Sequence, residues 1–269
     1  LWMLAYIFLV IAVLLIIKPT VNALFLSELG IEQLPFAFLL VAITAVTSSY
    51  FYSKAVSRFS LKKVIEVTII SSITILIGLG ILLSLHVVSG VLLYFFYIWV
   101  AIYAVLSASQ FWILANLVFS IREAKRLFGF IGSGAIIGGI FGGYLTSILA
   151  PLIGNENLMF VAALLLFFCI PLLRKIWNIR VKKNVSFRKH KNPISNTEPP
   201  LKLILKSKHL TYIASIVAVS VVVAKLVDYL FSEFASSSIT DADDLTAFFA
   251  FQHSIYYHCL FSYFSPIEL

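Results

Sequence analysis

The chain has few charged residues. Asp, Glu, Lys and Arg make up 12% of its 269 residues, whereas hydrophobic residues make up 61%. Soluble domains carry about a quarter charged residues, so this chain has too little polar surface to cover a water-soluble fold. A lipid bilayer is the solvent that suits such a composition. The two cysteines, Cys169 and Cys259, are isolated in the sequence, which argues against a disulfide scaffold and against a cysteine metal cluster.

The sequence also lacks the residue patterns of an enzyme. No Ser/His/Asp order, no pair of carboxylates and no metal-ligand spacing stands out, and the five histidines are scattered. A glycine-rich run at 129–143 lacks the Lys-Ser/Thr ending of a phosphate-binding loop and lies in an apolar stretch. We therefore expect no enzymatic activity, no cofactor and no metal site.

Long apolar runs are abundant instead. A membrane-spanning helix needs about 20 mostly apolar residues, and seven such stretches occur, with an eighth beginning near Leu245. The seven stretches are Leu1–Ser27, Leu34–Ser53, Val64–Leu85, Val91–Phe119, Leu127–Ile153, Leu158–Leu173 and Leu210–Phe234. Backbone inside a bilayer must satisfy its own hydrogen bonds, and a barrel would need short alternating segments. The sequence therefore predicts an all-α polytopic membrane protein.

Basic residues are confined to alternate loops. All but two of the 20 Lys and Arg residues lie after the second, fourth and sixth stretches, whereas the other loops carry acids such as Glu28, Glu156 and Asp243. Loops rich in Lys and Arg remain in the cytoplasm. We therefore expect a multi-pass protein of the bacterial inner membrane with a cytoplasmic N-terminus.

The two remaining basic residues, Lys18 and Lys225, lie inside apolar stretches. A charge at mid-membrane costs about 2.5–3.5 kcal/mol on insertion scales, so it normally faces a hydrated cavity or a partner. Lys18 can alternatively extend to the headgroups. Asn22 shares its helix face one turn on, and a cation beside an amide suits an anion such as phosphate. Lys225 can pair with Asp228 at i+3, either structurally or within a substrate site.

Three further groups of residues are candidates for a role in transport. Polar and aromatic residues of the fourth stretch either line a substrate path or serve interhelical hydrogen bonding and packing; they are Gln110, Trp112 and Asn116. A charged cluster follows, which is either a cytoplasmic gate or ordinary positive-inside charge; its members are Arg122, Glu123 and Arg126. Small residues repeat every four positions in the fifth stretch and predict a helix-packing seam; they are Gly134, Gly138 and Gly142.

The segment 178–208 is polar and basic and contains Asn-Pro and Pro-Pro, so it cannot cross a membrane. We predict a six-helix bundle at 1–177, a basic cytoplasmic linker at 178–208, and the first one or two helices of a second bundle at 209–269. The linker can also contact anionic lipid. The segments after Lys18 and Lys225 match loosely, which favours an internal repeat with a site where the two halves meet.

Several motifs resemble the ATP/ADP antiporter (nucleotide transporter) family of plastids and obligate intracellular bacteria. They are Phe111-Trp112-Ile113-Leu114-Ala115-Asn116, Glu123-Ala124-Lys125-Arg126-Leu127-Phe128-Gly129 and Gly132-Ser133-Gly134-Ala135, together with the segments around Lys18 and Val227-Asp228-Tyr229. The resemblance covers about residues 1–251. It implies a major facilitator-like architecture of twelve helices, exchange of ATP for ADP or proton-coupled nucleotide import, and substrate recognition by intramembrane lysines. By this resemblance, substrate recognition would be assigned first to Lys18 and then to Lys225.

The chain departs from that family at Trp99-Val100-Ala101, where exchangers usually carry a carboxylate, and after Phe251, where helices eight to twelve are expected. Three hypotheses follow: a transporter of a small anionic, phosphorylated solute, a non-transporting membrane scaffold or sensor, and an inactive truncated fragment. The expected partners are the lipid bilayer, a small anion such as ATP or ADP, and the missing C-terminal half of the same fold. A nucleic acid polymer is not expected.

Overall fold

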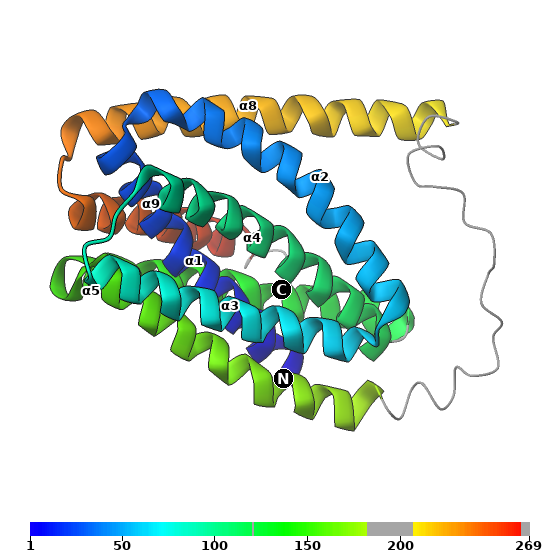
Figure 1. Ribbon diagram of the computed structural model, residues 1–269. Helices are drawn as coiled ribbons and strands as arrows, with labels where there is room; N and C mark the ends of the chain where they lie inside the picture. The colour runs from blue at the N-terminus through cyan, green and yellow to red at the C-terminus, as the bar shows by residue number, and fades with distance from the viewer. Residues whose placement is uncertain (120, 182–206, 265–269) are drawn as a thin grey trace.

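The computed structural model describes residues 1–119, 121–181 and 207–264. Within these residues every regular element is a helix and no strand occurs. Six of the helices are long and apolar enough to cross a membrane, and they form an elongated bundle in which α2 and α8 lie on one outer side (Figure 1). The prediction of an all-α protein with several membrane-spanning helices is confirmed.

The helices begin and end near the predicted stretches. They are α1 (Trp2–Leu29), α2 (Leu34–Arg58), α3 (Leu61–Ser84), α4 (Gly90–Val118), α5 (Ile121–Ile176), α8 (Lys208–Ser238) and α9 (Ala242–Phe264), with a 3-10 turn η1 (Ile31–Gln33) and a π-helical turn η2 (Trp177–Val181). α9 forms where the eighth stretch was expected to begin, but it is not among the six helices that are apolar enough to span. Of the predicted linker, 182–206 lies outside the described residues.

The predicted loop between the fifth and sixth stretches is reduced to a single non-helical residue. Gly154 has φ 81° and ψ 161° inside α5, and this residue divides α5 into a first arm, 121–153, and a second arm, 155–176. The region with positive φ and extended ψ is essentially restricted to glycine. The chain therefore changes direction with one residue where we expected a loop over Gly154–Asn157.

Contacts between helices show that the chain crosses the bundle in alternating directions. Gly80 of α3 lies against the ring of Phe160 in the second arm of α5. Further along, Glu66 of α3 accepts a hydrogen bond from Nε of Arg174 at 3.2 Å. Since the residue number falls along α3 while it rises along the second arm, these two segments are antiparallel.

The two ends of the bundle consequently carry different charges. At the end that holds Glu66 and Arg174, the ammonium of Lys175 lies 3.7 Å from the ring centroid of Trp2. At the opposite end, the backbone N–H of Asn155 donates to Oδ1 of Asp243 at 3.0 Å. Arg174 and Lys175 at the start of one basic segment therefore lie at one end of the bundle, and Asn155 and Asp243 of two acidic loops lie at the other.

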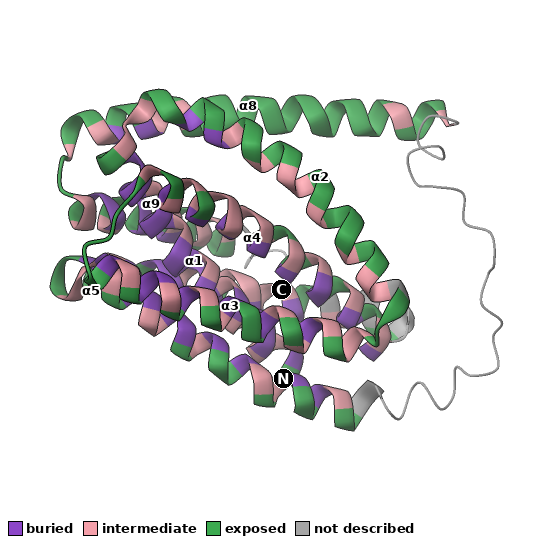
Figure 2. Ribbon diagram, in the orientation of Figure 1, coloured by how far each residue is buried: buried purple, intermediate pink, exposed green. Residues whose placement is uncertain are grey.

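α1 is the central helix and its buried side chains form the middle of the core. Val13, Ile16, Ile17 and Phe25 are fully buried, and buried residues concentrate on α1 and on the inward faces of its neighbours (Figure 2). α8 differs from the rest, because only Ser232 and Ala235 along its whole length are buried. The central position of α1 explains why a charge on this helix cannot simply face lipid.

The glycines predicted to form a packing seam lie against the backbone of α1. A Cβ atom added at Gly134 would meet Leu4, and one added at Gly138 would meet the main chain of Phe8. A Cβ atom added at Gly142 would likewise meet the main chain of Ala12, so the residue numbers rise in the same direction along α1 and α5. α1 and the first arm of α5 are therefore parallel and in backbone contact, which only small residues allow.

Candidate functional site

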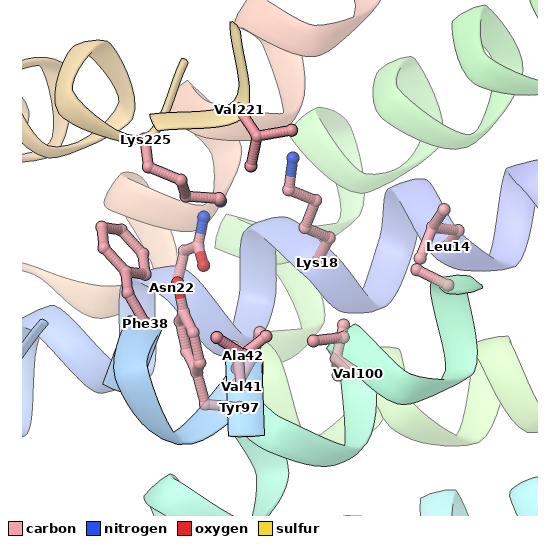
Figure 3. A pocket seen from close by; sticks show the side chains of 13 residues that line it. Leu14, Lys18, Asn22, Phe38, Val41, Ala42, Tyr97, Val100, Val221 and Lys225 are labelled. Atoms are coloured by element: carbon pink, nitrogen blue, oxygen red, sulfur yellow. The ribbon is translucent and has the colours of Figure 1, made fainter. Parts of the chain in front are cut away.

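A cavity of about 440 Å³ lies between α1, α2, α4 and α8. Its polar groups come from Lys18 and Asn22 on α1, Tyr97 on α4 and Lys225 on α8. Figure 3 shows Lys18 and Lys225 extending toward this space from different helices, with Asn22 beside the end of Lys225. The remaining walls are apolar side chains, namely Leu14, Val21, Phe38, Val41, Ala42, Val100, Ala101, Ala104 and Val221. The cavity therefore offers two amines, one amide and one phenol in an otherwise apolar space.

The backbone next to Lys18 carries a proline without breaking the helix. Pro19 has no N–H, so the carbonyl of Leu15 loses its usual partner one turn earlier. The hydroxyl of Thr146 on α5 lies 3.5 Å from that carbonyl oxygen and 2.8 Å from the carbonyl oxygen of Gly142. Hydroxyls of neighbouring helices commonly stabilise such positions in membranes. α1 remains continuous, and Lys18 and Asn22 stay one turn apart on the cavity face.

The ammonium of Lys18 has a neutral partner. Nζ lies 3.2 Å from Nε2 of His253 on α9, and Lys18 is partly buried. Within the part of the chain that the structure describes, no carboxylate forms an ion pair with it. Asp228, which lines the same region, forms its ion pair with Lys225 and not with Lys18. Lys18 therefore has no direct ion pair among the described residues.

Lys225 is in a different state, because its charge is already paired. Nζ donates to Oδ2 of Asp228 at 2.9 Å, as the i+3 spacing predicted, and lies 4.8 Å from the ring centroid of Phe38. Both side chains of the ion pair are about half exposed, at 45% and 52%. Lys225 therefore contributes a neutralised cation to the cavity wall, whereas Lys18 contributes an unneutralised one.

A narrow extension of about 30 Å³ continues from Lys18 toward the acidic end of the bundle. Aromatic side chains of three helices narrow it, namely Phe38 of α2, Phe231 of α8 and Phe249 of α9. The site is therefore narrow on the acidic side, where these three aromatic rings meet.

The candidates on α4 lie away from the cavity. Gln110 is buried and its amide donates to the hydroxyl of Thr68 on α3 at 2.8 Å, which is the interhelical hydrogen bond considered as its alternative role. Trp112 is 48% exposed and packs edge-on against Phe111. Asn116 is exposed as well. None of the three lines the cavity around Lys18, so their binding role stays a prediction.

The predicted gate can be placed only in part. Arg122 and Arg126 belong to the first turns of α5, but their side chains lie outside the described residues, and Glu123 is exposed. The same end of the bundle holds a charge pair that the sequence did not single out, between Glu66 of α3 and Arg174 of α5. Nζ of Lys62, one turn before Glu66 on the same helix, lies 3.9 Å from Oε1 of Glu66.

His253 is the site residue that the sequence analysis missed. It is 235 positions from Lys18 and lies in a segment rich in aromatic residues and outside the region of family resemblance. No local pattern could have indicated the contact, because it arises from the packing of α9 beside α1. The described residues contain no group of three or more His, Cys, Asp or Glu that could hold a metal ion.

Known proteins supply no further guide to this site. Comparisons of the chain with protein-family models, with curated proteins and with solved structures found no match.

Proposed function

We propose that this chain is a secondary membrane transporter that carries a small anionic, phosphorylated solute by alternating access. The observation that carries the proposal is the environment of Lys18, a partly buried amine in an apolar cavity whose near partner is an imidazole and not a carboxylate. An isolated buried cation is strongly unfavourable until a counter-charge joins it. A solute that supplies this counter-charge would therefore bind with the charge of Lys18 as its main attraction.

The other groups of the cavity support the same class of solute. Asn22 and the Lys225–Asp228 pair add hydrogen-bonding groups beside Lys18, and Tyr97 and Phe38 add aromatic surface. The volume falls within the range of about 300–1,000 Å³ that is usual for small-molecule sites. A solute with a phosphate group at one end and an aromatic ring at the other matches this distribution, and the motif resemblance to ATP/ADP exchangers points to nucleotides.

Alternating access requires a site that is closed on one side and a helix that can move. The narrow, aromatic-lined extension beyond Lys18 supports a restricted side of the site. α8 contributes Val221 and Lys225 to the cavity, although almost none of its surface is buried. We propose that motion of α8 against α1 opens the site, within a major facilitator-like arrangement of two bundles. The basic end of the bundle would then face the cytoplasm of the bacterial cell.

The test is binding of radiolabelled ATP to the purified full chain in phosphatidylcholine nanodiscs, followed by uptake of ATP into cells that express it. A charge-assisted hydrogen bond contributes about 1.5–3 kcal/mol, so Lys18→Gln should weaken binding about 10- to 150-fold. Lys18→Arg should retain much of the affinity. Lys63→Gln removes the same charge from an exposed position at the start of α3 and should leave binding unchanged.

Lys225→Gln should have a smaller effect than Lys18→Gln, because Asp228 already neutralises Lys225. A panel of other anions, scored by thermal stabilisation, would narrow the substrate, since a ligand present at 100 times its Kd stabilises the folded state by about 2.7 kcal/mol. If ATP and every other phosphorylated compound fail to bind, or if binding ignores Lys18→Gln, the transporter proposal is wrong. The scaffold or sensor hypothesis would then be preferred.

A further inference from the structure

His253 sits at the junction of the cavity and its narrow extension. It belongs to α9, and its imidazole lines the extension together with Lys18, Lys225 and Asp228. Its Nε2 atom is 3.2 Å from Nζ of Lys18, and its Nδ1 atom is 2.8 Å from the carbonyl oxygen of Phe249. Both ring nitrogens are therefore engaged, one with the backbone of its own helix and one with the cation of the site.

These two contacts fix where the ring carries its hydrogen. A carbonyl oxygen can only accept a hydrogen bond, so Nδ1 must be the donor toward Phe249. An ammonium group can only donate, so Nε2 must present its lone pair to Lys18. With Lys18 as an ammonium group, this geometry is that of a neutral imidazole in a single tautomer, with its one basic position occupied by Lys18.

A proton on Nε2 would reverse this contact. The acceptor would become a second donor, and two positive charges would face each other across the distance that now holds a hydrogen bond. The charged groups that surround the ring are Lys18 on α1 and Lys225 and Asp228 on α8, with the phenol of Tyr97 on α4 nearby. The one carboxylate among them is already paired with Lys225, and α5 presents glycines to this side of α9. An anion in the cavity would balance both cations at once.

We propose that His253 is a proton-responsive ligand of the anion site. In its neutral form it holds the ammonium of Lys18, and in its protonated form it releases Lys18 and binds the anion beside it. The inference rests on the proposed function, because it assigns a second ligand and a proton to the same site. It predicts that one proton is taken up with each anion and that a multiply charged phosphorylated anion is preferred over a singly charged one.

The affinity should therefore rise with falling pH. Uptake of one proton on binding changes the binding constant by up to about tenfold per pH unit. The experiment measures the Kd for radiolabelled ATP at pH 6 and pH 8 for the full chain in phosphatidylcholine nanodiscs, where no anionic lipid competes. Wild type is compared with His253→Gln, which keeps a polar side chain but cannot be protonated in this range. His258→Gln is the matched control, since His258 is an exposed histidine of the same helix.

The pH dependence of His253→Gln measures the titration of ATP itself, and it is subtracted from that of the other proteins. After this correction, we expect wild type and His258→Gln to bind ATP at least about tenfold more tightly at pH 6 than at pH 8. Calorimetry of wild type in buffers of different ionisation enthalpy should give uptake of about one proton per ATP. This second measurement needs no variant, so it remains decisive if His253→Gln does not fold.

The outcomes separate this inference from the function on which it rests. Binding of ATP that depends on Lys18, but with no proton uptake or with the same pH dependence in His253→Gln as in wild type, overturns the role of His253 and leaves the transporter proposal standing. Absence of binding by wild type at both pH values, for ATP and for the panel of other phosphorylated anions, overturns both.

Discussion

Replacing Gly138 with alanine tests the seam that fixes α1, and Lys18 with it, against α5. A Cβ atom at this position would lie 2.9 Å from Cα of Phe8 and also against the carbonyl group of Phe8. Carbon atoms in contact normally stay about 3.5–4.0 Å apart, so the two helices would have to separate by roughly 0.6–1.1 Å. The obstacle is backbone, which cannot rotate aside as the end of a side chain can. Overpacking of this kind costs about 1–3 kcal/mol.

The measurement is reversible unfolding in mixed micelles, followed by circular dichroism. Gly78→Ala on α3 is the matched control, because nothing lies within 4 Å of a Cβ atom there. Both substitutions gain about 1 kcal/mol of helix propensity, so the difference between the two variants isolates the packing cost. We expect Gly138→Ala to be less stable than Gly78→Ala by about 1–3 kcal/mol. Equal stability of the two variants would show that α1 and α5 are not in backbone contact, and the position of Lys18 would then need another explanation.

Three further predictions use simpler measurements. Gly154→Ala should lower the free energy of unfolding by about 1–3 kcal/mol, because an alanine at φ 81° and ψ 161° is strained; no loss would refute the sharp turn. Thr146→Val should cost about 0.6 kcal/mol, the average for hydrogen bonds between membrane helices, and a neutral result would mean that the Leu15 carbonyl does not need this hydroxyl. Single cysteines at Lys63 and Glu32 should react with a membrane-impermeant maleimide from the cytoplasmic and the outer side respectively, and labelling from one side would contradict the alternating threading.

The fold was largely predictable because a helix that crosses a bilayer must be long and apolar, and such stretches are easily recognised in a sequence. Apolar stretches of sufficient length and the sorting of basic residues into alternate loops predicted every helix within a few residues at most ends. The exception is the turn at Gly154, where polar residues suggested a loop but one glycine conformation is enough. Sequence patterns report composition over a window, and they do not report which single residue changes the direction of the chain.

The site was predictable only where a residue contradicts its surroundings. Lys18 and Lys225 stand out because each is a charge inside an apolar run, and both line one cavity. Gln110 stands out for the same reason, yet it bonds to Thr68 away from the cavity. Polarity in a membrane span therefore indicates that a side chain has a partner, without indicating which kind. His253 has no such contrast, and its role follows from tertiary packing alone.

The glycines of α5 connect the seam to the chemistry of the site. On one side Gly138 touches the backbone of α1, which carries Lys18, and on the other side Gly143 touches Ser254 of α9, next to His253. The helices that carry both partners of the Lys18–His253 contact are thus held to α5 by backbone packing, so the backbones of α1 and α9 keep their separation while the two side chains can still move. Lys225 is carried by α8, which buries only Ser232 and Ala235. The closely packed helix α1, which carries Lys18 without an ion pair, therefore faces the loosely packed helix α8, which carries the ion-paired Lys225. Closure around an anion should accordingly proceed by movement of α8 toward α1, with the Lys18–His253 distance set by protonation and not by helix motion.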